Sequence, residues 1–191
     1  MHYDINDYPA VKDYLLSFGI ERLEQTGNTR LINGQLIKSR KKTNNKWFET
    51  QDSISYWDDF SQQKIIWGEI SDKPKFALDE TGNYFVEATT FMMTGENLNY
   101  ILLFLNSSLS EYYFSTFGTT TGVGTLRWKK FKLEQFAIPL INNINDVYIA
   151  SLRQIMETPI KSISKINSLV YSIYGLSDNE IKFISQFLEN R

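Results

Sequence analysis

The spacing of apolar residues predicts a helix close to the N-terminus. Asp7 is suited to cap this helix, and Pro9 is suited to its first turn. Apolar side chains at helical spacing then continue to about Gln25. From there to Trp47 the chain is rich in Gly, Asn and Lys, and we expect irregular structure.

The middle of the chain predicts short strands and then a core helix. Runs of β-branched and aromatic residues, separated by turn signals, are "QKIIWGEI" from Gln63, "FAL" from Phe76 and "NYFVEATTFMMT" from Asn83. An apolar stripe from Leu98 to Tyr113, with a break at 106–108, predicts the core helix. A last strand-like run, "KLEQFAIPL", ends with Pro139 and Leu140.

The last 45 or so residues are helical in pattern throughout. Helices are predicted over 147–157 and from Ile160 to about Tyr174, where Gly175 can take the left-handed cap. "SDNE" at 177–180 matches a capping box and predicts the start of a final helix. The fold class predicted is therefore α+β: a small twisted mixed β-sheet packed with helices, followed by a C-terminal helical tail. We expect residues 1–144 to form the main domain and residues 145–191 an extension that packs on it or on a partner.

The amino-acid composition excludes several kinds of catalytic and metal-binding site. The chain of 191 residues has no cysteine, which excludes disulfides and thiolate metal sites. Its single histidine, His2, leaves almost no material for a histidine-based catalytic triad or zinc site. No apolar run approaches the roughly 18 residues of a membrane span, and the N-terminus does not resemble a signal peptide. We therefore expect a soluble cytoplasmic protein without a membrane partner.

The net charge of -2 conceals a segregation of charge. Residues 38–46, "KSRKKTNNK", include five basic residues and no acidic one, and residues 127–132, "RWKKFK", include four and none. The rest of the chain holds 11 of the 20 basic residues and all 22 acidic ones. Such local concentration favours an anionic partner, although two solvated loops would have the same pattern.

Catalytic motifs are not found in the sequence. It has no phosphate-binding loop of the G-x-x-x-x-G-K-[ST] kind, and Gly122-Val123-Gly124 lacks the third glycine of a dinucleotide fingerprint. Since none of the four prolines are adjacent, it also lacks the Asn/Asp-Pro-Pro-Tyr/Phe run of amino-methyltransferases. The acidic residues Asp58, Asp59 and Glu69 leave a compact metal-dependent nuclease open as an alternative. The pattern favours a binding module without catalysis of its own.

Basic residues interleaved with aromatic ones are typical of nucleic-acid binding, because Lys and Arg neutralise phosphates while aromatic rings stack on bases or brace a loop. Arg127 and Arg40 are suited to bidentate contact with guanine, and the lysines to the backbone. Trp128 is our candidate for the anchor of its segment. The candidate DNA-binding residues are Arg40, Lys41, Lys42, Asn44, Asn45, Lys46, Thr119, Thr120, Thr121, Gly122, Gly124, Arg127, Lys129 and Lys130.

Several blocks, in consistent order, resemble one family. They are "YPAVKDYLLSFGIERL", "KWFETQDSISYWDDFSQQKIIWGEIS", "NYFVEATTFMMTG", "YILLFLNSSLSEYYF", "GVGTLRWKKFKLEQFAIP" and "LVYSIYGLSDNEI". Together they resemble the TaqI-like C-terminal specificity domain of Type IIG restriction-modification enzymes, which is related to the recognition domains of Type I specificity subunits. The resemblance covers nearly the whole chain.

The resemblance implies a module for phage defence that reads a double-stranded DNA sequence for an adenine-N6 methyltransferase domain or subunit. Residues 1–144 would then be the DNA target-recognition domain. S-adenosylmethionine and magnesium are expected only in the methyltransferase or nuclease parts, and no cofactor in this chain. The C-terminal helices are candidates for oligomerisation or a methyltransferase contact. The alternative from another class is a protein-interaction subunit whose basic loops dock on an acidic partner.

Overall fold

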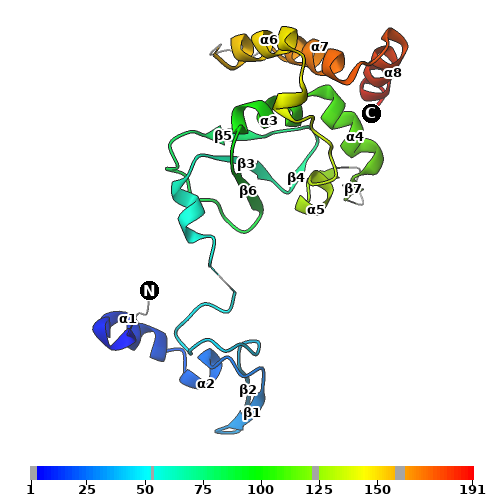
Figure 1. The fold of residues 1–191 in the computed structure, drawn as a ribbon. Coiled ribbons are helices and arrows are strands. Elements are labelled where there is room, and N and C mark those ends of the chain that lie inside the picture. Colours follow the sequence, from blue (N-terminus) through cyan, green and yellow to red (C-terminus); the bar gives the residue numbers. More distant parts are fainter. Residues whose placement is uncertain (1–3, 53, 122–124, 158–161) are drawn as a thin grey trace. The chain divides into compact units, whose positions relative to one another are not determined.

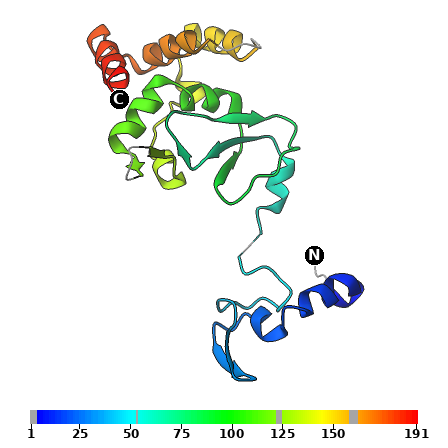
Figure 2. The same cartoon turned by 180° about the vertical axis from the view of Figure 1, so that it is seen from behind.

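The computed structural model describes residues 4–52, 54–121, 125–157 and 162–191. The chain divides into two compact units, Met1–Trp57 and Asp58–Arg191, which Figures 1 and 2 show from opposite sides. The predicted α+β class is confirmed, since each unit combines helices with short strands. Among the described residues, no helix has the length and apolar character needed to cross a membrane.

The first unit begins with helices that are shorter than predicted. A 3₁₀ helix η1 (Ile5–Asp7) is followed by α1 (Pro9–Leu16) and α2 (Ile20–Leu23). Gly19, with φ of +86°, separates α1 from α2 in a conformation that favours glycine. The single helix predicted from Asp7 to Gln25 is therefore wrong: Pro9 does begin α1, but the preceding cap position is Tyr8 rather than Asp7.

The region predicted to be irregular contains a β-hairpin. Strand β1 (Thr29–Ile32) pairs antiparallel with β2 (Gln35–Lys38). The two turn residues, Asn33 and Gly34, have φ of 49° and 77°. Positive φ at both positions is what a two-residue hairpin turn requires, and Asn-Gly is its strongest sequence signal. The sequence therefore carried the information, and the prediction of irregular structure was wrong.

The second unit contains two small antiparallel sheets. In the first, β3 (Lys64–Gly68) lies between β5 (Ala77–Asp79) and β6 (Thr90–Thr94). In the second, β8 (Leu126–Arg127) lies between β4 (Ile70–Ser71) and β7 (Thr119–Thr120). All pairings between the described strands are antiparallel, where the sequence predicted one mixed sheet.

Helices form the rest of this unit, and their bounds follow the predictions at most points. The core helix is divided into α3 (Leu98–Leu105) and α4 (Ser108–Phe117), as the break at 106–108 indicated. The tail contains α6 (Asp146–Glu157), α7 (Ile163–Tyr174) and α8 (Asp178–Glu189), after a 3₁₀ helix η3 (Ile141–Asn143). Gly175 takes the left-handed cap, and Ser177 and Glu180 form the predicted capping box. A 3₁₀ helix η2 (Trp57–Ser61) precedes β3.

The strand predicted to end at Pro139 does not form. Residues 130–133 make a short helix, α5 (Lys130–Leu133), and residues 134–140 are turn and irregular structure. Lys132 and Leu133 each bond back to Lys129 O at 3.0 Å, which closes a helical turn directly after Trp128. These backbone hydrogen bonds form a helical turn where the apolar alternation predicted a strand.

Helix α3 is the centre of the second unit. Six of its eight residues are buried, because it packs against the sheets on one side and against α6 and α7 on the other. One cluster includes Ile65, Trp67 and Trp128, and the other includes Phe104 and Val170. Figures 1 and 2 show the helices of the tail lying across α3 and α4.

An ion pair is buried between β3 and β5. Lys64 Nζ lies 2.5 Å from Asp79 Oδ2, with side chains 0% and 1% exposed, and it also donates to Phe60 O at 2.7 Å. Asp79 accepts backbone hydrogen bonds from Gly82 at 2.9 Å and Tyr84 at 3.0 Å. Burial raises the pKa of Asp79, but the bonds from Lys64 and the following turn outweigh burial and hold this pKa far below its ordinary value. The Asp79 carboxylate therefore stays ionised at neutral pH.

Candidate nucleic-acid interface

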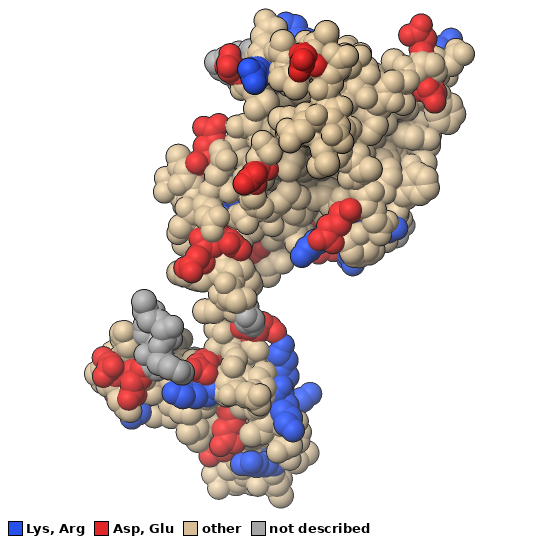
Figure 3. Space-filling model, viewed as in Figure 1, with Lys and Arg blue, Asp and Glu red and all other residues tan. Residues whose placement is uncertain are grey.

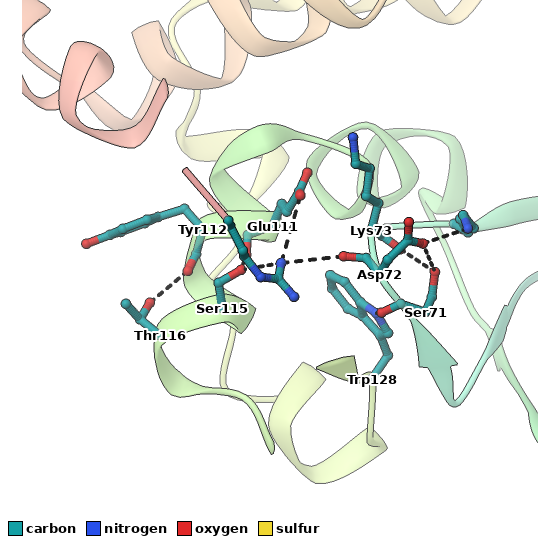
Figure 4. Close-up of polar contacts among 10 residues, drawn as sticks. Ser71, Asp72, Lys73, Glu111, Tyr112, Ser115, Thr116 and Trp128 are labelled. Atoms are coloured by element: carbon teal, nitrogen blue, oxygen red, sulfur yellow. Dashed lines mark hydrogen bonds and ion pairs between the residues drawn. The ribbon is translucent and has the colours of Figure 1, made fainter. Parts of the chain in front are cut away.

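The second basic segment, residues 127–132, starts from a buried tryptophan. Trp128 is 1% exposed, and its backbone N–H donates to Glu69 O at 2.7 Å. Its indole Nε1 donates to Ser71 O at 3.1 Å, and its own carbonyl accepts from Trp67 Nε1 at 2.8 Å. The Phe114 ring lies 4.4 Å away. Trp128 is therefore the anchor of the segment, as predicted (Figure 4).

Lys129, which is half-buried, and Lys130, which is exposed, follow this anchor. Lys129 occupies the N-cap position of α5, and Lys130 is the first residue of the helix. Leu133, 5% exposed, returns the chain to the core one turn later. Lys130 forms a surface ion pair with Glu134 at 3.7 Å, which contributes little in water. The backbone of the two lysines is thus fixed between two buried side chains, so binding an anion requires ordering of the lysine side chains alone.

Arg127 is tied to the strand beside it. Its Nη1 lies 3.0 Å from Glu69 Oε1, and the two side chains are 38% and 25% exposed. The Glu69 carboxylate is therefore already paired with the guanidinium group of Arg127. Among the described residues, no group of three or more His, Cys, Asp or Glu side chains is arranged to hold a metal ion.

The threonines of the candidate site lie on the hairpin that leads to Arg127. Thr119 and Thr120 form β7 opposite β8, and the Thr121 N–H donates to Thr125 O at 2.7 Å. Thr120 is exposed. The hydroxyls of Thr119 and Thr121 are buried, and no hydrogen-bond partner for either is found in the described part of the chain. Gly122 and Gly124 lie outside the described residues.

The C-terminal arginine fastens the helical tail beside this sheet. Arg191 Nη1 donates to Ser115 Oγ of α4 at 2.8 Å and to Asp72 O at 3.4 Å. It also lies 3.9 Å from Glu111 Oε1. Burial raises the pKa of Glu111, which Arg191 opposes. Figure 4 shows Glu111 and Ser115 of α4 facing the Ser71–Lys73 segment, which lies next to Trp128. Arg191, which follows α8, is therefore hydrogen-bonded to the same segment, residues 71–73, that accepts the indole hydrogen bond of Trp128.

The first basic segment, residues 38–46, lies in the first unit, and its central arginine points into that unit. Arg40 Nε donates to Leu23 O at 2.8 Å and Nη1 to Glu49 O at 3.1 Å, while Nη2 donates to Trp47 O. Gln25, 6% exposed, joins the same network by donating to Lys46 O at 2.9 Å. Because the described residues of this unit include no buried apolar side chain, these polar bonds act as its core.

The other candidates of this segment differ in their contacts. Lys41 forms an exposed ion pair with Asp52. Asn45 Nδ2 donates to Thr50 O at 2.8 Å, which holds the loop closed. Lys42, Asn44 and Lys46 have exposed side chains. The structure therefore brings Arg40 to Lys46 together around one loop of the first unit, and Thr119 to Thr121 with Arg127 to Lys130 around one sheet of the second.

Replacement of Arg40 by lysine should loosen the first unit while keeping its charge. A single ammonium group cannot reach three separate carbonyls, so at least one charged hydrogen bond, worth about 2 kcal/mol, is lost. We expect hydrogen exchange of the Gly27 N–H, which bonds Arg40 O at 2.8 Å, to accelerate by roughly 30-fold. Lys42→Ala, at an exposed position, is the control and should leave this exchange unchanged. Equal exchange in Arg40→Lys and the unaltered chain would contradict the structural role.

Comparison with known proteins gives two findings. A family model described as the TaqI-like C-terminal specificity domain matches residues 13–140. The Type II methyltransferase M.BstVI of Geobacillus stearothermophilus is 25% identical over 190 residues, which cover 97% of this chain and 31% of that relative. The chain thus spans about a third of the length of the curated relative that it matches. The family match includes most of the first unit and the whole of the second basic segment.

Proposed function

Because the chain belongs to the TaqI-like C-terminal specificity domain family, we propose that it recognises a sequence in double-stranded DNA for a methyltransferase of a restriction-modification system. The similarity to a Type II methyltransferase supports this association. A methyltransferase that extracts a base from the stack gains from a separate domain that holds and reads the duplex. The adenine-N6 specificity and the Type IIG class expected from the sequence are part of this proposal.

The single observation that carries the proposal is the display of Lys129 and Lys130. The buried side chains of Trp128 and Leu133 fix both ends of the segment; between them Lys129 is partly exposed and Lys130 is exposed, in a chain that is acidic overall. Fixed cations of this kind suit the phosphate backbone, where each contact releases a counterion. We propose that Lys129 and Lys130 hold phosphates, and that Thr120 and Arg127 lie close enough in the sheet to share the contact.

The roles proposed in the first unit change with the structure. Lys42, Lys46 and Asn44 remain candidates for DNA contact, because their side chains are exposed. Arg40 is assigned a structural role, since its guanidinium already donates to backbone carbonyls. We further propose that residues 1–144 carry recognition, and that residues 145–191 brace it by packing on α3 and α4.

We propose that the chain has no catalytic activity of its own. Of the acidic residues of the nuclease alternative, Glu69 is paired with Arg127 at 3.0 Å, and the Asp59 carboxylate accepts a hydrogen bond from Gln62 Nε2 at 3.4 Å. Incubation with supercoiled DNA and magnesium should therefore give no cleavage. Cleavage that is lost in Glu69→Ala would contradict the proposal and support a nuclease.

Selection from a random duplex pool is the experiment that tests DNA recognition. The full chain should enrich one common sequence, and its affinity for that sequence should exceed its affinity for unselected duplex by roughly 1,000-fold. An acidic polypeptide such as poly-glutamate serves as the control polyanion and should not compete at equal charge. Recovery of no common sequence, together with equal binding to poly-glutamate, would favour the protein-interaction alternative.

A further inference from the structure

The tip of the β1–β2 hairpin carries two solvent-exposed apolar side chains. Leu31 and Leu36 are directly opposite each other in the antiparallel register. Their side chains are 70% and 76% exposed. Opposite residues of an antiparallel pair share one face of the ribbon, so the two leucines form a single apolar point. The turn residues Asn33 and Gly34 are also exposed, and so is Gln35, which lies on the opposite face of the ribbon from the leucines.

The surroundings of this apolar point are basic. Residues 26–48, which include the hairpin, contain six Lys or Arg residues and no Asp or Glu. Figure 3 shows basic side chains gathered along one edge of the Met1–Trp57 unit. Arg30 is paired with Glu24 at 3.4 Å, whereas Lys38 is exposed at the base of the hairpin. An apolar tip within a positive surface matches duplex DNA, in which anionic phosphates lie outside and the stacked bases lie inside.

The base of the hairpin is fixed, so the tip is presented in one direction. Ser39 is 7% exposed and donates to Asn28 O through its backbone N–H at 2.9 Å and its hydroxyl at 3.0 Å. Thr26 Oγ1 lies 2.8 Å from Ser39 Oγ, and Gly27 N–H donates to Arg40 O at 2.8 Å. A preorganised ribbon loses less entropy on binding than a free loop would.

From this geometry we infer that the β1–β2 hairpin reads A·T base pairs in the major groove. The inference rests on the proposed function and assigns the hairpin a part in it. The major groove is wide enough to admit a two-stranded ribbon. It displays the thymine methyl group, which Leu31 and Leu36 can contact, and the adenine N6 and N7 atoms, which the amide of Asn33 in the turn can bind bidentately. The two side-chain types at the tip therefore match the two bases of one pair.

Removal of thymine methyl groups tests the inference. The full chain is titrated with the duplex recovered by selection and with copies in which deoxyuridine replaces one thymidine at a time. This replacement deletes the major-groove methyl and leaves base pairing unchanged. At one or more positions the substituted duplex should bind about fourfold more weakly, as expected for loss of one buried methyl contact.

The variant Leu31→Ser/Leu36→Ser should lose this discrimination and bind thymidine and deoxyuridine duplexes equally. Because both leucines are exposed, hydrogen exchange of the Ser39 N–H should stay as in the unaltered chain. Leu140→Ser is the matched control, since Leu140 is 71% exposed in the second unit and should retain full discrimination.

Each other outcome overturns the inference in a distinct way. Equal binding of every deoxyuridine duplex by the unaltered chain would show that no thymine methyl is read, while DNA recognition itself would stand. Discrimination that persists in the leucine variant would place the methyl contact on another element. Weaker binding by the variant without discrimination in the unaltered chain would indicate a minor-groove wedge. Failure to bind any selected duplex would remove the proposed function, and with it this inference.

Discussion

Charge reversal in Lys129→Glu/Lys130→Glu should weaken duplex binding by roughly 100-fold at 0.1 M salt, because each phosphate contact contributes about tenfold under these conditions. Both lysines lie at the start of α5, between the buried residues Trp128 and Leu133. The slope of log affinity against log salt should become shallower by about 1.8, since two counterion-releasing contacts are lost. Titrations across a series of salt concentrations measure both quantities.

The matched control for this variant is Lys165→Glu/Lys182→Glu. These lysines are exposed on α7 and α8, so the control has the same net charge as the test variant. If only overall charge mattered, both variants would lose affinity and salt dependence equally. Specific binding that keeps its salt dependence in the Lys129/Lys130 variant would show that phosphates are contacted elsewhere.

Replacement of Lys64 by methionine should lower the melting temperature of the second unit by roughly 10 °C. Lys64 and Asp79 are almost fully buried and lie 2.5 Å apart, so removal of the cation leaves a carboxylate in the interior without its counter-charge. Methionine fills a similar volume, which separates the loss of charge from the creation of a cavity. Thermal unfolding followed by circular dichroism measures the change.

Lys75→Met is the matched control for this prediction. Lys75 pairs with Asp72 at 2.7 Å, but the two side chains are 66% and 68% exposed, so its loss should change stability very little. A melting temperature that falls equally in both variants would contradict a special role for burial.

The acid dependence of the buried pair follows from the lowered pKa of Asp79. A carboxyl group with a lower pKa in the folded state than in the unfolded state stabilises the fold above its unfolded pKa, and this contribution is lost as pH falls through the folded value. The contribution of Asp79 should therefore persist at mildly acidic pH and disappear only in strong acid. In Lys64→Met this contribution should be smaller, so the variant should denature at a higher pH than the unaltered chain.

Local chemistry was sufficient for elements whose boundaries depend on a few neighbouring residues. The capping box of α8 formed because Ser177 and Glu180 satisfy each other's backbone groups within one turn. The Asn33-Gly34 turn belongs to the same class, since positive φ at both residues selects a tight hairpin, although the surrounding polar sequence obscured it. Both features could be read from short stretches of sequence.

The sequence predicted the basic segments of the candidate site and the residue that anchors one of them. It did not predict which basic side chains are exposed and which bind backbone carbonyls. Two basic segments were visible in the sequence, and Trp128 was predicted to be the anchor because large aromatic side chains are mostly buried; the structure shows it 1% exposed. Arg40 and Lys42 lie two positions apart and have the same charge. Arg40 nevertheless donates to backbone carbonyls inside the first unit, whereas Lys42 is exposed. No local pattern separates them, because the carbonyl acceptors of Arg40 are at Leu23, Trp47 and Glu49.

The sequence by itself determined the α+β class, the helices of the tail, the break between α3 and α4 and the concentration of positive charge, since periodicity, capping and composition act over short distances. Only the tertiary structure decided that Lys64 is buried against Asp79, that the Arg40 guanidinium donates to backbone carbonyls and that residues 130–133 form a turn of helix instead of a strand. Each of these outcomes depends on partners brought together by folding, whose desolvation and hydrogen bonds outweigh local propensity.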